Sequence, residues 1–475
     1  MSTEHNNKQS SESRQNQNHF LLFLNAVRRM FPELYSSFNA AHEYDPRNQS
    51  RIIYPMPMIL LIVFLKNAMS YVSMRGFWGA FDENIVIQNI LYLTGAVFNN
   101  INKLPHFQTV NDFMSVLDPI FLDNLTITIF KTIIDRKLLY NYRYRRLWVI
   151  AVDATEIYRG SKKIHEKCLY CVHNRGKEDE YTEYYISVLV ASLVLVGTKV
   201  SIPFCCLFIE NNAEDAERQA SMSADSIKQD CETKAFKRLA EKLKVKLRKL
   251  DICILFDSLY ASKPIMEICI NNGWNFIIRY KSGSYPEIQK DVDGLRKKNM
   301  VNTLSDEESA KHNYRDVYYS LGHILSEIVK INFVHATSTL KSEKYGSFQW
   351  ITSLTIDDVR VYKLINIGRA RWLIENQTFQ RLKRWTNNIE HLCCLSEYAI
   401  KNHLRMIIIT EIFRIFYEFE TFSKDEANTR PTYERIREKL RHGFGMILFS
   451  TRSWTAVYEW KPQVGRGRSK CVDTT

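Results

Sequence analysis

The order of apolar segments between residues 147 and 281 constrains the fold more than any other feature of this sequence. Three segments are rich in β-branched and apolar residues, and their connections are too short to hold helices. Such a run predicts three consecutive strands in an antiparallel meander. The segments are residues 147–158, 184–197 and 200–210.

Helices and strands alternate after the meander. One apolar stripe, with lysines around it, predicts an amphipathic helix, and its members are Phe236, Leu239, Leu243 and Leu247. A buried strand at 251–257, a helix from Pro264 to Asn271 and a strand at 274–281 follow. The order is that of an RNase H-like sheet, so the expected fold class is α/β (α+β), a mixed sheet flanked by helices. A fold alone does not determine a function.

The remaining segments predict a division of the chain into six parts. The pattern before residue 146 is helical, and turn signals with two strand-like runs interrupt the core after residue 284. The expected parts are a disordered tail (1–18), an all-helical N-terminal domain that binds DNA (19–145), the first part of the catalytic core (146–284), a β-rich insertion (285–355), a helical end of the core (356–420) and a basic C-terminal segment (421–475).

The charge balance favours a polyanionic partner. Lys and Arg number 65 against 52 Asp and Glu, which gives a formal net charge of +13. Nucleic acid is the first candidate and an anionic membrane surface the second, with ordinary solvating charge as the alternative explanation.

Cysteine placement and the chain start indicate a cytoplasmic protein. Several of the ten cysteines lie in apolar runs, as buried thiols of a reducing compartment do. The polar first residues lack the apolar core of a secretory signal. The apolar stretch 58–65 is far shorter than the roughly 20 residues that span a bilayer. We therefore expect no membrane partner.

Two aspartates follow buried strands of the expected sheet. Asp153 is predicted to close the first core strand, and Asp257 the strand after the amphipathic helix. Neighbouring strands would bring the two carboxylates together, which is unfavourable unless a cation lies between them. Mg²⁺ and Mn²⁺ prefer such oxygen ligands, and a pair of these ions stabilises both oxygens of a phosphoryl displacement. The alternative is a structural capping role for each aspartate.

A third carboxylate, Glu375, lies on a predicted helix at 368–385. Arg371 is one turn before it and Lys383 two turns after it. This pattern fits a salt-bridged helix surface, or a metal-binding carboxylate among cations that hold DNA phosphates.

Several motifs in order resemble insertion-sequence transposases of the DDE superfamily over residues 45–410. They are DPRNQSRIIY (45–54), LPHFQTVNDFMSVLDP (104–119), VDAT (152–155), KQDCE (228–232), FDSLYAS (256–262), RWLIENQTFQRLK (371–383) and NIEHL (388–392).

The resemblance implies a metal-dependent enzyme that cuts transposon ends and transfers the strands into target DNA. Asp153, Asp257 and Glu375 would be catalytic and would hold two Mg²⁺ or Mn²⁺ ions, with Arg371 and Lys383 on DNA. The implied partners are double-stranded DNA, both terminal repeats and target, and a second copy of the chain in the synaptic complex. The implied location is the bacterial cytoplasm.

This sequence departs from the superfamily in two places near Glu375. A Tyr often stands three residues before the Arg, where this chain has Gly368. The Lys usually stands seven residues after the Glu, where Leu382 lies here. The alternative functions are a metal-dependent nuclease of the same core without strand transfer, and an inactive DNA-binding descendant of a transposase.

Three further features have two interpretations each. His165, Cys168, Cys171 and His173 have the residue types of a structural zinc site but are crowded for one tetrahedron, and otherwise they are loop or packing residues. Acidic residues of KQDCE would suit a helix start. Trp350, Trp372 and Trp385 are core residues or stacking platforms for unpaired bases.

Overall fold

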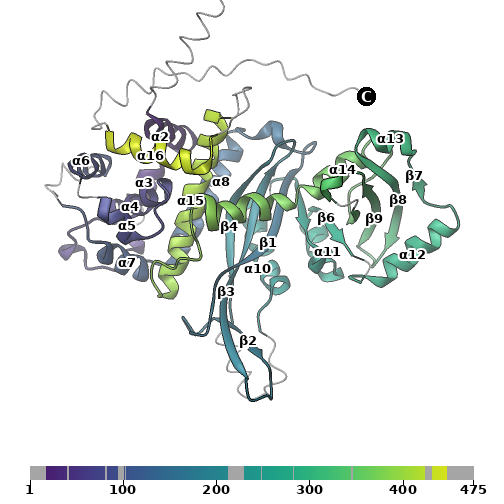
Figure 1. Cartoon of the computed structure of the whole chain (residues 1–475), viewed down its shortest axis with the longest axis horizontal. Coiled ribbons are helices and arrows are strands. Elements are labelled where there is room, and N and C mark those ends of the chain that lie inside the picture. Colours follow the sequence, from purple (N-terminus) through teal and green to yellow (C-terminus); the bar gives the residue numbers. More distant parts are fainter. Residues whose placement is uncertain are drawn as a thin grey trace, which may run out of the picture. The chain divides into compact units, whose positions relative to one another are not determined.

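The computed structural model describes residues 18–39, 42–80, 83–94, 101, 103–211, 229–247, 249–281, 283–343, 346–422 and 431–446 (Figure 1). The chain divides into two compact units, Met114–Ile412 and a second one made of Met1–Phe113 with Phe413–Thr475. The expected N-terminal tail, apart from Asn18, and the basic stretch 461–470 lie outside the described residues.

One ten-stranded sheet runs through the unit Met114–Ile412. Nine strands follow the order β2-β3-β1-β5-β6-β10-β9-β8-β7, and β4 pairs with the other side of β3. The strands are β1 (Trp148–Gly160), β2 (Leu169–His173), β3 (Tyr181–Leu195), β4 (Val200–Ile209), β5 (Ile252–Phe256), β6 (Asn275–Tyr280), β7 (Asn302–Thr303), β8 (Tyr314–Ile324), β9 (Lys330–Ser338) and β10 (Ser347–Thr352).

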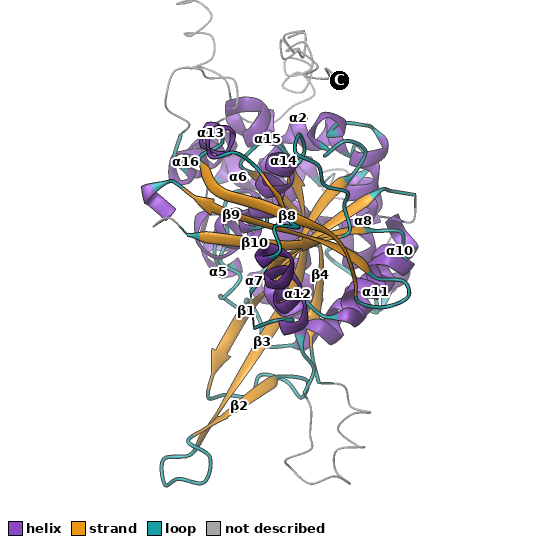
Figure 2. Cartoon of the chain, turned by 90° about the vertical axis from the view of Figure 1, so that its right-hand side faces the viewer, coloured by secondary structure: helices purple, strands orange, loops and turns teal. Residues whose placement is uncertain are grey.

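Five of these strands have the pairing of an RNase H-like core. β3 is antiparallel to both β1 and β4, which forms the expected meander. β1 is parallel to β5, and β5 is parallel to β6. The prediction of a mixed sheet flanked by helices is therefore confirmed, and Figure 2 shows the helices around the strands.

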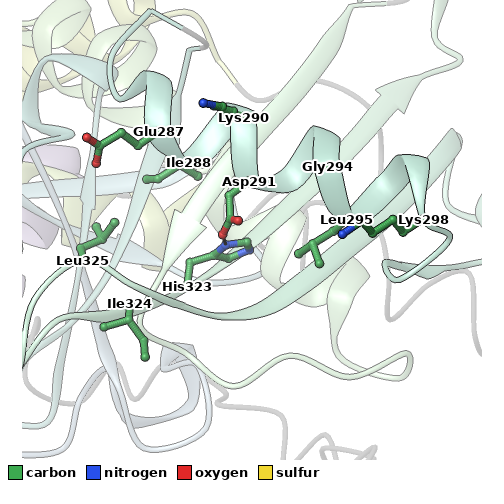
Figure 3. A pocket seen from close by; sticks show the side chains of 10 residues that line it. All are labelled: Glu287, Ile288, Lys290, Asp291, Gly294, Leu295, Lys298, His323, Ile324 and Leu325. Carbon is green, nitrogen blue, oxygen red and sulfur yellow. Dashed lines mark hydrogen bonds and ion pairs between the residues drawn. The ribbon is translucent and has the colours of Figure 1, made fainter.

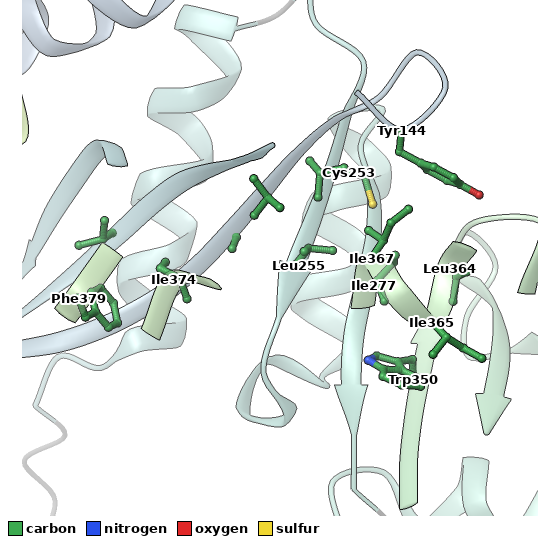
Figure 4. Packing of buried hydrophobic residues seen from close by; sticks show 14 of the residues in the cluster. Tyr144, Cys253, Leu255, Ile277, Trp350, Leu364, Ile365, Ile367, Ile374 and Phe379 are labelled. Atoms are coloured by element: carbon green, nitrogen blue, oxygen red, sulfur yellow. The ribbon is translucent and has the colours of Figure 1, made fainter. Parts of the chain in front are cut away.

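Helices cover this core as the apolar stripes predict. α10 (Glu232–Leu247) buries the stripe of Phe236 and its partners, and it packs against β3 and β4. α11 (Lys263–Asn271) and α14 (Val361–Arg369) both contact β6. Every residue of β5 is buried, as expected for a parallel strand covered on both faces. Figure 4 shows the resulting core, where Cys253 and Leu255 of β5 lie near side chains of α14.

The β-rich insertion extends this sheet. It contains α12 (Pro286–Lys297), α13 (Asp306–Lys311) and strands β7 to β10. β10 pairs antiparallel with β6 and with β9, so main-chain hydrogen bonds continue from the core into the insertion. The insertion is thus joined to the RNase H-like part of the sheet at β6.

One expectation about the meander was wrong. Asp153 does not close the first strand, because β1 continues seven residues further to Gly160, paired with the long strand β3. Residues 169–173 form a further strand, β2, against β3, which the sequence did not predict. In Figure 1 the hairpin of β2 and β3 extends away from the rest of the sheet.

The helical end of the core is less regular than its apolar pattern suggests. α14 ends at Arg369, and two π-helical segments, Ile374–Phe379 and Arg381–Trp385, follow it. Single π-helical turns within helices occur often at functional sites. α15 (Glu397–Phe422) then begins in this unit. α8 (Pro119–Asp135) packs against β4.

The other unit is helical in the residues that the structure describes, as predicted for the region before residue 146. Every residue of α4 is buried, which explains its continuous apolar run. Its helices are α2 (His19–Met30), α3 (Leu34–Asn39), α4 (Met56–Ala68), α5 (Met74–Gly79), α6 (Asn84–Leu93) and α16 (Tyr433–Met446), with most of α7 (Phe107–Val116) and the end of α15.

Across the described ranges, no single helix has both the length and the apolar character needed to cross a membrane. The bent pair α7 and α8 passes that test only when its two helices are counted together.

Candidate active site

The parallel register of β1 and β5 aligns two aspartates. Ala151 lies opposite Leu255, and continuing this register by two residues aligns Asp153 with Asp257. β5 ends at Phe256 while β1 continues, so Asp257 stands at the point where the two strands separate. The two aspartates thus lie on adjacent backbone segments, and their pairing at one metal site stays a prediction.

Asp257 begins a tight turn without capping it. The turn Ser258–Tyr260 follows β5 directly, and the Asp257 carboxylate accepts no hydrogen bond from its backbone. A structural capping role is therefore not seen for this aspartate. The turn instead orients Tyr260, a fully buried side chain whose Oη donates to Glu232 Oε2 at 3.1 Å.

Arg371 connects the first carboxylate to the third. Its Nη1 lies 3.2 Å from Asp153 Oδ2 and 2.7 Å from Glu375 Oε1. The guanidinium is 7% exposed, whereas the Glu375 side chain is 47% exposed. One buried cation thus holds two acidic side chains that are more than 200 residues apart in the sequence.

Burial makes the charge of Asp153 costly. Loss of solvent raises the pKa of Asp153 to about 7, against the opposing effect of Arg371. The negative charges of Glu375 and Glu232 raise this pKa further, and the Ala154 N–H, which donates to Asp153 Oδ1 at 3.0 Å, lowers it. Asp153 therefore lies in an acidic environment that Arg371 only partly neutralises.

The chemistry of this donor set fits Mg²⁺ or Mn²⁺. Asp153, Asp257 and Glu375 offer hard carboxylate oxygens with no sulfur or imidazole among them, the ligand type that these ions select. Arg371 now lies between two of the three carboxylates, and the residues that the structure describes contain no three His, Cys, Asp or Glu that converge on one metal position.

A small pocket of arginines and aromatic rings lies next to Arg371. Its volume is about 50 Å³, and its lining consists of Arg279, Phe348, Trp350, Gly368, Arg369, Arg371 and Trp372. Arg279 on β6 donates to the Ser347 and Gln349 carbonyls at 3.0 and 3.2 Å. Burial and the charges of Arg371 and Arg369 lower the pKa of Arg279 to about 10, although Asp257 opposes this shift.

Gly368 explains why this chain lacks the Tyr of the wider superfamily. A Cβ at position 368 would lie 2.6 Å from Trp350 Nε1, so the indole fills the space where a side chain would begin. Trp350 is 1% exposed and its Nε1 has no hydrogen-bond partner. Trp350 is thus a core residue at this pocket, whereas Trp372 is 48% exposed and Trp385 half-buried.

The second predicted cation, Lys383, pairs with a different acid. Lys383 Nζ lies 2.8 Å from Glu390 Oε1, in the segment NIEHL. This ion pair fastens the end of the π-helical segment to the following turn. A role for Lys383 on DNA remains a prediction.

The histidine and cysteine cluster is not gathered around a point. Cys168 is buried beside the β2 strand, while Cys171 is exposed on it. His173 Nε2 lies 2.9 Å from Glu183 Oε2, and its ring stacks on Tyr181. His165 is half-buried, with a buried Nδ1 that has no partner.

The KQDCE segment contains site residues that the motif alone did not reveal. Lys228 lies outside the described residues. Gln229 bonds the backbone of Tyr170 through both ends of its amide, and Asp230 pairs with Arg238. Glu232, by contrast, reaches Tyr260 at the site. Sequence reasoning also missed Arg279, whose position depends on pairing between β6 and β10.

Another hollow lies at the end of the insertion. Figure 3 shows a pocket of about 460 Å³ between α12 and the end of β8. His323 Nδ1 lies 2.7 Å from Asp291 Oδ2 there, an ion pair when the imidazole is protonated. None of its ten lining residues belongs to the acidic cluster.

Comparisons with known proteins give a match to a family model and matches to solved structures, one of which is described here. Residues 228–410 match the model of the transposase DDE domain family, a range that contains Asp257 and Glu375 but begins after Asp153. No curated protein matches the chain significantly. The solved structure is a cryo-EM structure of a piggyBac transposase synaptic complex with hairpin DNA.

That structure is similar at a TM-score of 0.40 and 11% identity, over 94% of this chain and 83% of the other. The likeness is loose, and the fold of the present chain is established by its own strand order. Together with the ordered motifs and the pairing of β1 with β5, the family match identifies residues 228–410 as a transposase DDE domain on an RNase H-like sheet.

Proposed function

We propose that this protein is a DNA transposase that cuts the ends of its element and joins them to target DNA. The observation that supports this most is the ion pairing of Arg371 with both Asp153 and Glu375, next to the strand whose register aligns Asp153 with Asp257. The match to the transposase DDE domain family adds the reaction class.

The three carboxylates would hold two Mg²⁺ or Mn²⁺ ions. Such a pair, when bound, activates the attacking oxygen and neutralises the leaving oxygen of a phosphodiester. Asp153 and Asp257 are on adjacent backbone segments of the sheet, so the scaffold fixes their separation. Glu375 is exposed and would approach from the helical side. Arg371 would favour the ionised form of Asp153 against the effect of its burial.

Cations near the cluster would bind the DNA backbone. Arg279 and Arg369 line the pocket together with Arg371. Exposed lysines of α10 in the same unit, such as Lys237 and Lys244, offer further positive charge. Phosphate contacts position a protein on DNA without reading its sequence. The partners would be the terminal repeats, the target duplex and, in the synaptic complex, a second copy of the chain.

The test uses a labelled duplex that carries the element's terminal repeat with flanking DNA. We expect Mg²⁺- or Mn²⁺-dependent nicking at the repeat boundary, followed by joined products, and none of either with EDTA. Asp153→Asn should abolish nicking and retain DNA binding in a mobility-shift assay. Nicking without joined products would indicate a nuclease of the same core, and binding without cleavage an inactive descendant.

A further inference from the structure

Arg279 on β6 is a half-buried cation that forms no ion pair with any residue that the structure describes. Its guanidinium donates to the Ser347 and Gln349 carbonyls at 3.0 and 3.2 Å. The ordinary explanation is structural, because these two bonds join β6 to β10. A guanidinium has five N–H donors, however, so the two bonds use only part of its capacity.

Aromatic rings hold this guanidinium in place and shield it from solvent. Its central carbon lies 4.8 Å from the ring centre of Phe348 and 5.4 Å from that of Trp350. Burial lowers the pKa of Arg279 to about 10, because a cation is less stable where water is excluded. A bound anion would offset this cost.

The other two arginines of the same pocket already have acidic partners. Arg369 forms an ion pair with Glu343, and Arg371 contacts both Asp153 and Glu375. None of the seven lining residues is acidic. The positive charge without a counterion in this pocket is therefore that of the arginine on β6.

A second unused donor lies at the wall of the pocket. Trp350 Nε1 is buried and has no hydrogen-bond partner among the described residues. It lies 2.6 Å from the position that a Cβ of residue 368 would take, so only glycine leaves room beside the indole N–H. An indole nitrogen donates and does not accept. Both unused groups therefore require an acceptor.

The pocket has the size of a small anion. Its volume of about 50 Å³ holds roughly three to five water-sized groups, since each needs about 10 to 15 Å³. A phosphate group, with four oxygens around phosphorus, has this size, whereas a nucleobase is larger. The planar fork of an arginine also matches the oxygens of a phosphate. Trp372, which is 48% exposed, lines the pocket as well, so the pocket borders the surface.

We propose that this pocket binds one backbone phosphate of the DNA strand, with Arg279 as the residue that contacts it. The inference rests on the proposed function, because that function makes DNA the partner. Arg371 links the pocket to the candidate active site, since it lines the pocket and contacts Asp153 and Glu375. The phosphate would therefore lie close to the position of cleavage.

The experiment measures binding of the full-length protein to the terminal-repeat duplex in EDTA, so that no cleavage is needed. Each duplex of a series carries one uncharged methylphosphonate at a different position around the repeat boundary. At one position the wild type should lose roughly ten- to hundredfold in affinity, as expected for a hydrogen bond to a charged group. Arg279→Gln should bind the unmodified duplex more weakly by a similar factor and lose nothing further at that position.

Two further variants and a control accompany this test. Arg279→Lys keeps the charge without the fork and should recover part of the affinity. Trp350→Phe removes the indole N–H and should reduce the effect of the same methylphosphonate, which keeps the inference testable if Arg279→Gln is unstable. The matched control is Arg360→Gln at the other end of α14, where the exposed arginine pairs with Asp357, and it should bind every duplex like the wild type.

The salt dependence of binding is a second readout. Loss of one phosphate contact lowers the slope of log affinity against log salt concentration by about 1, and loss of a purely structural contact leaves it unchanged. If Arg279→Gln keeps the wild-type slope and loses as much affinity as the wild type at every modified position, Arg279 only joins β6 to β10 and the inference is wrong. If the wild type binds the terminal-repeat duplex no better than an unrelated duplex, the proposed function is wrong as well.

Discussion

The guanidinium of Arg371 lies 3.2 Å from Asp153, although 218 residues separate them in the chain. The contact joins the middle of β1 to the helical segment that carries Glu375. It makes Arg371 the countercharge of both carboxylates. Arg371 thus has an electrostatic role beside Asp153 in addition to its proposed role on DNA.

Replacing Arg371 with Gln should impair the enzyme through Asp153. Loss of the cation leaves a buried carboxylate without its countercharge, so the pKa of Asp153 should rise above its present value of about 7. We expect nicking at pH 7 to fall by about a hundredfold or more, and stability at pH 8 to fall by about 1 to 3 kcal/mol.

Rates across pH 6 to 9, together with urea unfolding, measure both effects. Arg384→Gln is the control, because Arg384 is an exposed basic residue of the same helical end. Equal nicking by Arg371→Gln and Arg384→Gln would contradict the role of Arg371.

Gly368→Ala should destabilise the unit that contains the sheet. The new methyl group would come within 2.6 Å of Trp350 Nε1, and the indole is too well packed to move freely. Overpacking of this kind costs about 1 to 3 kcal/mol. Gly294→Ala on α12 meets no atom within 4 Å and should be neutral or slightly stabilising.

Thermal unfolding of the two alanine variants compares these sites directly. Adding Trp350→Phe to Gly368→Ala should give a double variant more stable than the sum of the two single changes predicts. Strict additivity would mean that the two side chains do not compete for the space.

Glu411→Gln should be among the more damaging single changes in the core. Glu411 is fully buried and pairs with Arg381, itself 3% exposed, at the start of the second π-helical segment. Thr386 Oγ1 donates to the same carboxylate at 2.8 Å. Removing the charge takes a buried countercharge away from the buried guanidinium, which costs about 3 to 5 kcal/mol.

Chemical denaturation of Glu411→Gln and of the exposed control Glu308→Gln gives the comparison. Glu308 pairs with Lys311 on the surface, where solvent screens the interaction, so its loss should change the stability little. A loss for Glu411→Gln no larger than that of the control would contradict the importance of the buried pair.

The helical unit should lose stability in mild acid because of His19. Burial, and then the charge of Lys439, lower the pKa of His19 from 6.5 to about 4. The unfolded chain therefore binds a proton that the folded unit does not. The contribution of neutral His19 to the free energy of unfolding is complete above pH 6.5 and is lost as the pH falls through 4. After allowance for the partial exposure of His19, this contribution is about 1 to 2 kcal/mol.

In His19→Gln the side chain has no charge at any of these pH values, so the stability of the helical unit should depend less on pH between 4 and 7. Hydrogen exchange of the α2 backbone amides over this range, corrected for the intrinsic exchange rate, measures the stability of that unit. An unchanged pH dependence in His19→Gln would show that another group is responsible.

The sequence was sufficient for the order of the core strands. Continuous apolar runs rich in β-branched residues are a local signal, and the parallel pairing of β1 and β5 follows from the helix between them. The continuation of β1 past Asp153 was missed because residues 153–160 are partly exposed and polar, and they are held in a strand by β3.

The remaining site residues depend on contacts that no local pattern encodes. Glu232 and Arg279 reach the site through the packing of α10 and the pairing of β6 with β10. Trp350 and Gly368 face each other from a strand and a helix. The bond between Tyr260 and Glu232 likewise joins residues of different elements, so their spacing in the sequence carries no signal.

The most direct test of the central claim exchanges one ligand and then the metal. In Asp257→Cys a thiolate replaces the carboxylate, and thiolates favour softer ions than Mg²⁺. The account predicts that this variant fails to nick the terminal-repeat duplex in Mg²⁺ and regains nicking in Mn²⁺, whereas Asp257→Ala is inactive in both. Nicking by Asp257→Cys in Mg²⁺ at the wild-type rate would contradict a metal-binding role for Asp257.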